Sequence, residues 1–244
     1  MGKTIVITGA AIGLGRAMAR RFAKDGDTVV LLGRTLSKVQ ALADELGAPA
    51  FAVECDVASA DSVRQAFAEI AARHPKIDVL INNAGIYEPF LVEKATDEQI
   101  TQIIAINMVG PMFCARAAIP MMERGGSIIN VSSDSVGNDL PMMSVYQASK
   151  AGLERFTQSL IKELRPAGIR VMTVRAGPMY EEGKRPTWDP EVAMQFHQAC
   201  AASGINLQTQ GVSHVDSVAP VFRALVDLPA DVHITASHIE GRVP

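Results

Sequence analysis

The sequence predicts an α/β fold, a doubly wound parallel sheet of about seven strands with helices on both faces. Two observations carry this prediction. Short runs of β-branched and aliphatic residues alternate with segments in which apolar residues recur every three or four positions. Glycine or polar residues follow most of these runs, as is typical of the edge where parallel sheets bind ligands.

The predicted strands are short and mostly apolar. They cover residues 3–8, 28–32, 50–55, 77–81, 127–131, 169–174 and 234–239. Amphipathic helices are expected between them, after a turn at residues 9–15 and at 37–46, 61–73, 96–121, 146–164 and 215–228. The crossovers of such a sheet are expected to be right-handed.

The composition fits a single folded domain over residues 1–244. Hydrophobic residues make up 48% of the chain and the net charge is −3, so we expect a large core and no nucleic-acid partner. We find no run of about eighteen apolar residues and no secretory leader, and so expect a cytoplasmic protein without a membrane span. The three cysteines fit no metal-ligand spacing, which favours reduced thiols and no metal site.

A glycine-rich turn follows the first strand. Residues 9–15 read GAAIGLG and precede a predicted helix. Glycines let the backbone approach a phosphate, and a helix N-terminus offers unpaired N–H groups and the positive end of its dipole. The spacing differs from the longer dinucleotide fingerprint, so an ordinary tight turn remains an alternative.

Other candidates follow later strands at the same edge, namely Asp56, the turn at residues 82–85 and Arg34. Dinucleotide folds place near Arg34 either an acid for the ribose 2′-hydroxyl or an arginine for a 2′-phosphate. An arginine without an acid favours NADP(H) over NAD(H).

Ser133, Tyr146 and Lys150 could act together. Ser133 follows the fifth strand, and Tyr146 and Lys150 are four residues apart on a predicted helix, hence on one face. An ammonium beside a phenol favours the phenolate, so we expect the pKa of Tyr146 to fall below about 10. Each residue also has a simpler interpretation. Tyr146 and Lys150 could be surface neighbours, Ser133 could only form a turn, and Asn107 in the preceding helix could be a packing residue.

The alternation of strands and helices breaks after residue 178. Residues 179–211 contain a polar stretch rich in Glu, Lys and Pro, and then a helix capped by Asp189 with Pro190 as its first residue. An insertion near the strand ends predicts a substrate lid. Tyr180, Trp188 and Phe196 allow an apolar pocket there without requiring one.

Together these motifs resemble the short-chain dehydrogenase/reductase family over essentially the whole chain. The matching segments are TGAAIGLG at residues 8–15, Asp56, NNAG at 82–85, Asn107, Ser133 and YQASK at 146–150. The resemblance implies a Rossmann-like fold and hydride transfer between NADP(H) and a carbonyl or secondary alcohol. It implies a catalytic group of Asn107, Ser133, Tyr146 and Lys150, with Tyr146 as general acid and base. It also implies a homotetramer or dimer.

The resemblance further assigns roles to single residues. Lys150 would lower the pKa of Tyr146 and bind the nicotinamide ribose, Ser133 would hydrogen-bond the carbonyl oxygen, and Asn107 would hold a water for proton relay. The implied cofactor-binding residues are Gly9, Ala11, Ile12, Gly13, Leu14, Gly15, Arg34, Asp56, Val57, Asn83, Ala84, Gly85, Tyr146, Lys150, Gly177 and Met179.

The sequence departs from the family pattern after the sixth strand. The family usually has Pro-Gly followed by a Thr or Ser near the nicotinamide, whereas here Ala176-Gly177 is followed by Glu181 and Glu182. Two other functions stay open: a non-catalytic nucleotide-binding regulatory protein on the same fold, and an NAD-dependent alcohol dehydrogenase. The complete catalytic set favours an enzyme, a carbonyl reductase, and Arg34 disfavours NAD.

Overall fold

The computed structural model describes residues 2–184 and 188–243, and its centre is one parallel sheet of seven strands. They are β1 (Thr4–Thr8), β2 (Thr28–Gly33), β3 (Phe51–Glu54), β4 (Val79–Asn82), β5 (Ser127–Ser133), β6 (Arg170–Ala176) and β9 (Ala236–Ile239). Their spatial order is β3-β2-β1-β4-β5-β6-β9, and each neighbouring pair is parallel. The predicted doubly wound sheet is confirmed, with every strand within about two residues of its expected bounds.

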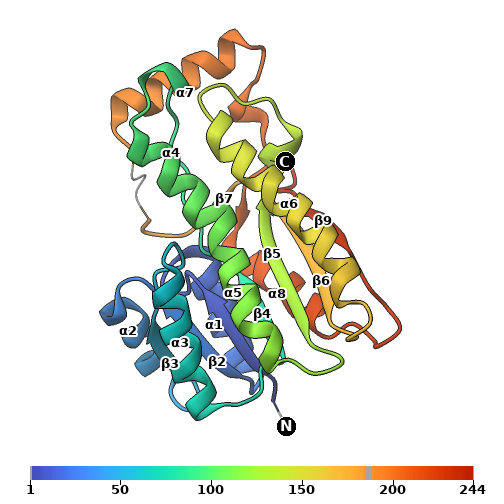
Figure 1. Cartoon of the computed structure of the whole chain (residues 1–244). Coiled ribbons are helices and arrows are strands. Elements are labelled where there is room, and N and C mark those ends of the chain that lie inside the picture. Colours follow the sequence, from blue (N-terminus) through green and yellow to red (C-terminus); the bar gives the residue numbers. More distant parts are fainter. Residues whose placement is uncertain (1, 185–187, 244) are drawn as a thin grey trace.

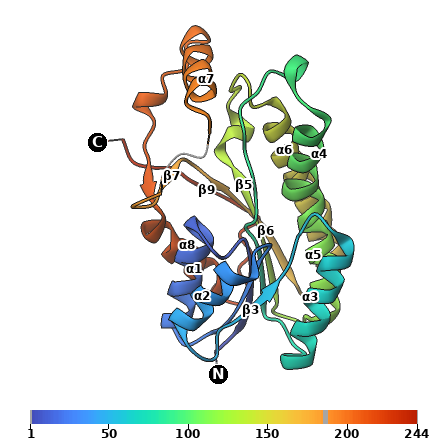
Figure 2. The same cartoon turned by 90° about the vertical axis from the view of Figure 1, so that its left-hand side faces the viewer.

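Helices cover both faces of this sheet (Figures 1 and 2). On one face lie α1 (Gly13–Lys24), α2 (Leu36–Leu46) and α8 (Val215–Val226). On the other lie α3 (Ala60–Arg73), α5 (Gly110–Ala118) and α6 (Ser144–Leu164). The two-residue period of the strands explains this sandwich, because successive side chains point to opposite faces.

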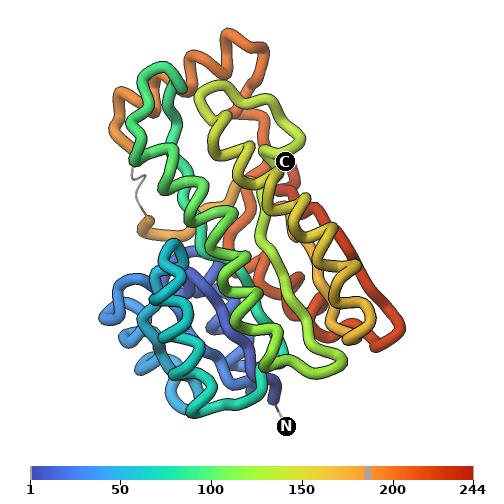
Figure 3. The backbone as a smooth tube through the Cα atoms, in the orientation of Figure 1, coloured from blue at the N-terminus to red at the C-terminus, as the bar shows by residue number. Residues whose placement is uncertain are grey.

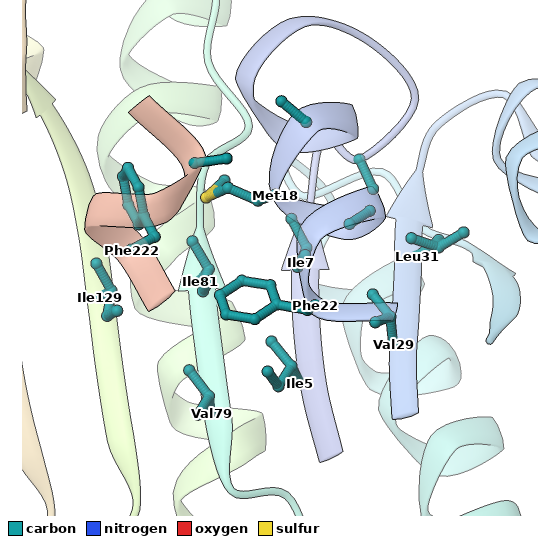
Figure 4. Packing of buried hydrophobic residues seen from close by; sticks show 14 of the residues in the cluster. Ile5, Ile7, Met18, Phe22, Val29, Leu31, Val79, Ile81, Ile129 and Phe222 are labelled. Carbon is teal, nitrogen blue, oxygen red and sulfur yellow. The ribbon is translucent and has the colours of Figure 1, made fainter. Parts of the chain in front are cut away.

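The first strand illustrates how the core is divided. Ile5 and Ile7 lie beside Phe22 of α1, in the same core cluster as Phe222 of α8, which lies next to Ile129 (Figure 4). Val6, between them in sequence, belongs to the core on the opposite face. Burying both faces of a strand requires the nearly continuous apolar run that the sequence shows.

The helix predicted over residues 96–121 is interrupted. It divides into α4 (Asp97–Ile104), one π-helical turn (Ala105–Val109), α5 and a 3₁₀ turn (Ile119–Met121). Pro111 has no N–H for the carbonyl of Asn107, which removes an ordinary helical hydrogen bond at this point. By length and composition the run Asp97–Met121 could cross a membrane, contrary to the expectation that no segment qualifies. Here it packs against α3 and α6, and Cys114 and Ala118 are buried in the core.

The described parts of the insertion, residues 179–184 and 188–211, lie beyond the carboxyl ends of the central strands (Figure 3). The insertion carries α7 (Pro190–Ala202), where Asp189 accepts a hydrogen bond from the backbone of Glu191, as the sequence predicts. Two short strands that the sequence did not predict, β7 (Met179–Tyr180) and β8 (Ser213–His214), pair at its base. Part of the predicted lid, residues 185–187, lies outside the described residues.

Candidate active site

The glycine turn is held directly against the end of β4. Gly9 has φ +64°, and a Cβ on it would lie 2.8 Å from the Cα of Ala84. A Cβ on Gly15 would lie 2.3 Å from the carbonyl oxygen of Gly9. The Asn83 amide donates to the carbonyls of Thr8 (3.0 Å) and Gly9 (3.2 Å). Only glycine fits at these two positions, and Asn83 supports the turn from outside.

This turn forms one wall of a cleft of about 350 Å³ at the switch point between β1 and β4. Most of the predicted cofactor-binding residues line it, which are Gly9, Ala11, Ile12, Gly13, Leu14, Arg34, Asp56, Val57, Asn83, Ala84 and Gly85. Seven residues outside the predicted cofactor-binding set line it too, which are Gly33, Thr35, Lys38, Cys55, Ile86, Ile106 and Lys184.

Five of the predicted residues are not among those that line the cleft, and two of these, Tyr146 and Lys150, belong to the catalytic group described below. Gly15 is buried in the packing of the turn. Gly177 donates its N–H to the carbonyl of Ile239 in β9 at 2.9 Å, and Met179 packs on the hydrophobic core. The loop after β6 therefore approaches the glycine turn farther along, through Glu181 and Lys184.

One end of the cleft is basic. Arg34 and Lys38 are exposed on its rim, and Lys184, from the loop after β7, lines the cleft beside Gly13. Lys38 lies in the first turn of α2, four residues after Arg34. A search for a second basic residue one helical turn beyond Arg34 would have found it. Lys184 is remote in sequence, and no spacing pattern pointed to it.

The catalytic candidates adjoin the other end of the cleft. Lys150 is buried, and its ammonium donates to the carbonyl of Val131 at 2.8 Å. A Cβ placed on Gly85 would lie 3.4 Å from the Lys150 nitrogen and 3.3 Å from Asn107 Oδ1. The Ser133 hydroxyl, at the end of β5, donates to Asp134 at 3.2 Å. β4, β5 and α6 thus bring these groups to the same edge of the sheet as the glycine turn.

The pKa of Tyr146 moves in the direction opposite to the expectation. Burial raises the pKa of Tyr146 to about 12; the Ser133 hydroxyl opposes this rise, while Tyr87 and Asp134 add to it. Burial lowers the pKa of Lys150 to about 8. The Lys150 nitrogen lies 6.0 Å from the centre of the phenol ring and points its hydrogen bond to Val131. The i, i+4 spacing placed the two residues on one face correctly, but burial outweighs their mutual attraction.

Asn107 lies in the π-helical turn and is buried. Its Oδ1 accepts from the backbone N–H of Ile86 at 2.9 Å, and its Nδ2 donates to the carbonyl of Ile86 at 2.8 Å. Nδ2 also donates to the Ser149 hydroxyl at 3.1 Å. Asn107 therefore clamps the segment after β4 to α6, next to Lys150.

An aromatic wall stands beside the phenol of Tyr146. The ring of Tyr87 lies 5.9 Å from that of Tyr146, and Trp188 lies 5.3 Å from Tyr87. Phe196 of α7 lies 5.7 Å from Trp188 and packs with Met143. Of the three aromatics noted in the insertion, Trp188 and Phe196 meet here, whereas Tyr180 pairs with His214 instead. The insertion thus brings apolar surface to Tyr146.

Known proteins share this architecture and much of this sequence. The chain is 37% identical over 172 residues to a 3beta-hydroxysteroid dehydrogenase of Mediterraneibacter gnavus, covering 68% of this chain and 62% of the relative. It is 35% identical over 185 residues to a 3-oxoacyl-acyl-carrier-protein reductase of Staphylococcus aureus, covering 72% and 74%. A crystal structure of a metagenomic short-chain oxidoreductase in complex with NADP superposes with a TM-score of 0.79 at 26% identity, covering 100% and 98%.

The family model described as short chain dehydrogenase matches residues 3–191. This span includes the glycine turn, the NNAG turn, Asn107, Ser133, Tyr146 and Lys150. The chain therefore belongs to the short-chain dehydrogenase/reductase family of oxidoreductases.

Proposed function

We propose that the protein transfers a hydride between NADP(H) and a carbonyl or secondary alcohol, and that it acts as a carbonyl reductase. The observation that carries this proposal is the junction at Gly85. There the polar atoms of Lys150 and Asn107 meet the cleft that the glycine turn lines. The same edge of the sheet holds Ser133 and Tyr146.

The cofactor fits the residues that line the cleft. The N-terminus of α1 at Gly13 presents backbone N–H groups suited to phosphate, and Asp56 and Val57 would hold the adenine. Arg34 and Lys38 supply two positive charges for a 2′-phosphate, which supports NADP(H) over NAD(H). The nicotinamide supplies the hydride in the reduction.

Proton transfer is the task of Tyr146. With a raised pKa its phenol is protonated at neutral pH, so Tyr146 can donate a proton to the substrate oxygen as negative charge develops there. Ser133 can hydrogen-bond the same oxygen. Lys150, whose pKa is about 8, can exchange protons near neutral pH and so return one to Tyr146. Asn107 holds the segment beside Lys150 in position.

The aromatic wall supports an apolar carbonyl substrate bound under a lid at residues 179–211. Tyr87 and Trp188 present ring surface beside Tyr146, and Met143 extends it. The names of two relatives, a hydroxysteroid dehydrogenase and an oxoacyl reductase, supply two apolar substrate classes to test. We also propose a cytoplasmic homo-oligomer, a tetramer or dimer, which cell fractionation and light scattering would check.

A carbonyl and alcohol panel tests the proposed function. The purified protein is given a 3-oxosteroid, a 3-oxoacyl thioester and a sugar alcohol, each with NADPH or NADP and with NADH or NAD, and the absorbance of the reduced cofactor is followed. We expect the apolar ketones to be reduced with NADPH, and Y146F to lose this activity. Binding of NADPH without turnover of any member would favour the non-catalytic regulatory protein instead.

A further inference from the structure

The carboxylate of Glu181 lies at the glycine turn, in the position of an anion. Its Oε2 accepts a hydrogen bond from the backbone N–H of Gly13 at 3.0 Å. Its Oε1 accepts from Nε of Arg16 at 3.0 Å, and Nη2 of Arg16 donates to the same oxygen. The side chain of Glu181 is only 12% exposed.

These contacts keep Glu181 ionised. Burial alone would raise its pKa, but the hydrogen bonds from Arg16 and Gly13, with the positive charges of Arg16 and Lys184, lower the pKa below its ordinary value. The first turn of α1 has no acidic residue, and its N-cap Ile12 offers no side-chain acceptor. The anion that complements the positive end of α1 therefore comes from Glu181, 168 residues away in sequence.

We infer that Glu181 stands in for a phosphate at the glycine turn, and that it exchanges with the pyrophosphate when the dinucleotide binds. This inference rests on the proposed function. A pyrophosphate bound at α1 needs the donors that Glu181 now holds, and two anions cannot share one N–H without strong repulsion. Glu181 thereby sets the affinity for the cofactor, because every binding event must first break its ion pair with Arg16.

Arg16 changes partner in this exchange. The carboxylate of Glu181 accepts hydrogen bonds from both the N–H of Gly13 and the guanidinium of Arg16. When that carboxylate leaves, the guanidinium is free to bind phosphate oxygens. Lys184 reinforces the site, since its nitrogen lies 3.7 Å from a Cβ built on Gly13. Arg16 and Lys184 are thus additional pyrophosphate ligands, beyond the residues that the sequence predicted.

The exchange also couples the cofactor to the lid. Glu181 and Lys184 form one turn, in which the N–H of Lys184 donates to the carbonyl of Glu181 at 3.2 Å. Four residues after Lys184, Trp188 donates its ring N–H to the carbonyl of Tyr87 beside Tyr146. Displacing Glu181 would therefore also move Lys184, which precedes Trp188 by four residues.

The test compares E181Q with the wild-type protein and with the matched control E182Q, which removes the same charge from an exposed neighbour. Titration calorimetry measures two ligands: NADPH, and 2′-AMP, which has a 2′-phosphate but no pyrophosphate. We expect E181Q to bind NADPH about tenfold more tightly, with unchanged affinity for 2′-AMP. E182Q should match the wild type for both ligands. Circular dichroism verifies that α1 stays folded, and E181A, which leaves no acceptor for Gly13, should shift the NADPH affinity in the same direction.

A second measurement needs no nicotinamide. Trp188 is the single tryptophan of the sequence, so its fluorescence reports on the insertion. Sodium pyrophosphate should change this emission in the wild type and in E182Q, and at about tenfold lower concentration in E181Q.

The two proposals fail in different ways. Equal NADPH affinity of E181Q and the wild type, or equal tightening in E182Q, would overturn the exchange while leaving the proposed function intact. If the wild type and E181Q both bind neither NADPH nor NADH, the proposed function itself is wrong.

Discussion

At the scale of single residues, Tyr146 is the proton donor that we propose. Its partly buried phenol has a pKa of about 12, so the phenol is protonated throughout the neutral range. We expect Y146F to lower turnover by at least about 100-fold and to leave NADPH affinity unchanged, because only the proton donor is removed. The control is Y87F, which alters the adjacent ring but keeps the phenol of Tyr146. Near-normal turnover of Y146F would exclude Tyr146 as the acid.

The pH dependence of the two directions follows from the same pKa. Reduction uses the protonated phenol, which predominates well below a pKa of about 12. Titration of Tyr146 should therefore not change the rate of reduction between roughly pH 6 and 9. Oxidation uses the phenolate, whose fraction rises about tenfold for each pH unit below the pKa. We expect the kcat/KM of alcohol oxidation to rise with pH across this range. A level oxidation profile would mean that another group takes the proton.

Arg34 and Lys38 are the residues that we propose select the cofactor. Both line the rim of the cleft after β2, where a 2′-phosphate would bind, and a charged hydrogen bond there is worth about 1.5–3 kcal/mol. We expect R34D to lower the preference for NADPH over NADH by at least tenfold, roughly the value of one such bond. R20Q is the matched control, since Arg20 pairs with Glu45 on the surface of α1. Equal use of both cofactors by the wild type would remove the role of Arg34.

At the scale of elements, the π-helical turn of residues 105–109 carries Asn107 and joins two parts of the site. N107A deletes its hydrogen bonds to Ile86 and Ser149 and leaves partly buried backbone groups of Ile86 without these partners. We expect a loss of about 2 kcal/mol of stability and a Tm lower by about 4–8 °C, together with reduced turnover. S149A removes only one of these bonds, so thermal unfolding should show a smaller loss. An unchanged Tm in N107A would leave Asn107 a purely catalytic role.

The strands could be predicted from the sequence, whereas the π-helical turn and the two shortest strands could not. The strands were predictable because their signal is local, as in the apolar run of β1. The π-helical turn was not, since the apolar spacing continues through it and only the interplay of Asn107, Pro111 and Ile86 opens the helix. β7 and β8 have two residues each, too few for any periodicity. Contacts between residues far apart in sequence were not predicted either. Glu181 and Gly13 are an example, because no local pattern encodes a partner 168 residues away.

At the scale of the whole molecule, burying the ionisable groups of the site lowers the stability of the folded protein. The sheet brings Lys150 into a buried position, where its ammonium has, among the residues that the structure describes, a single carbonyl partner at 2.8 Å. Withdrawing a charge from water disfavours its charged form, which is the origin of its lowered pKa. The same burial raises the pKa of Tyr146. The free energy of unfolding must therefore depend on pH through these two groups.

For Lys150 the sign of this dependence is defined. The pKa falls from 10.5 to about 8 on folding, a difference on the order of 3 kcal/mol. Below pH 8 both states carry the proton and the folded protein bears the full penalty. Between about pH 8 and 10.5 the folded protein releases the proton first, so the free energy of unfolding rises with pH, and above this range the penalty is gone.

Comparing the wild type with K150M isolates this contribution. Buried Cys55 and partly buried Tyr146 have raised pKa values that act in the opposite sense above about pH 9, but both proteins contain them. Denaturant unfolding at pH 7 and at pH 10 should show the wild type gaining stability relative to K150M by roughly 2–3 kcal/mol. K162M, which replaces an exposed lysine of the same helix, should show no such change. A difference between wild type and K150M that is constant with pH would mean that Lys150 keeps an ordinary pKa, and its assignment as a proton-exchanging group near neutral pH would fail with it.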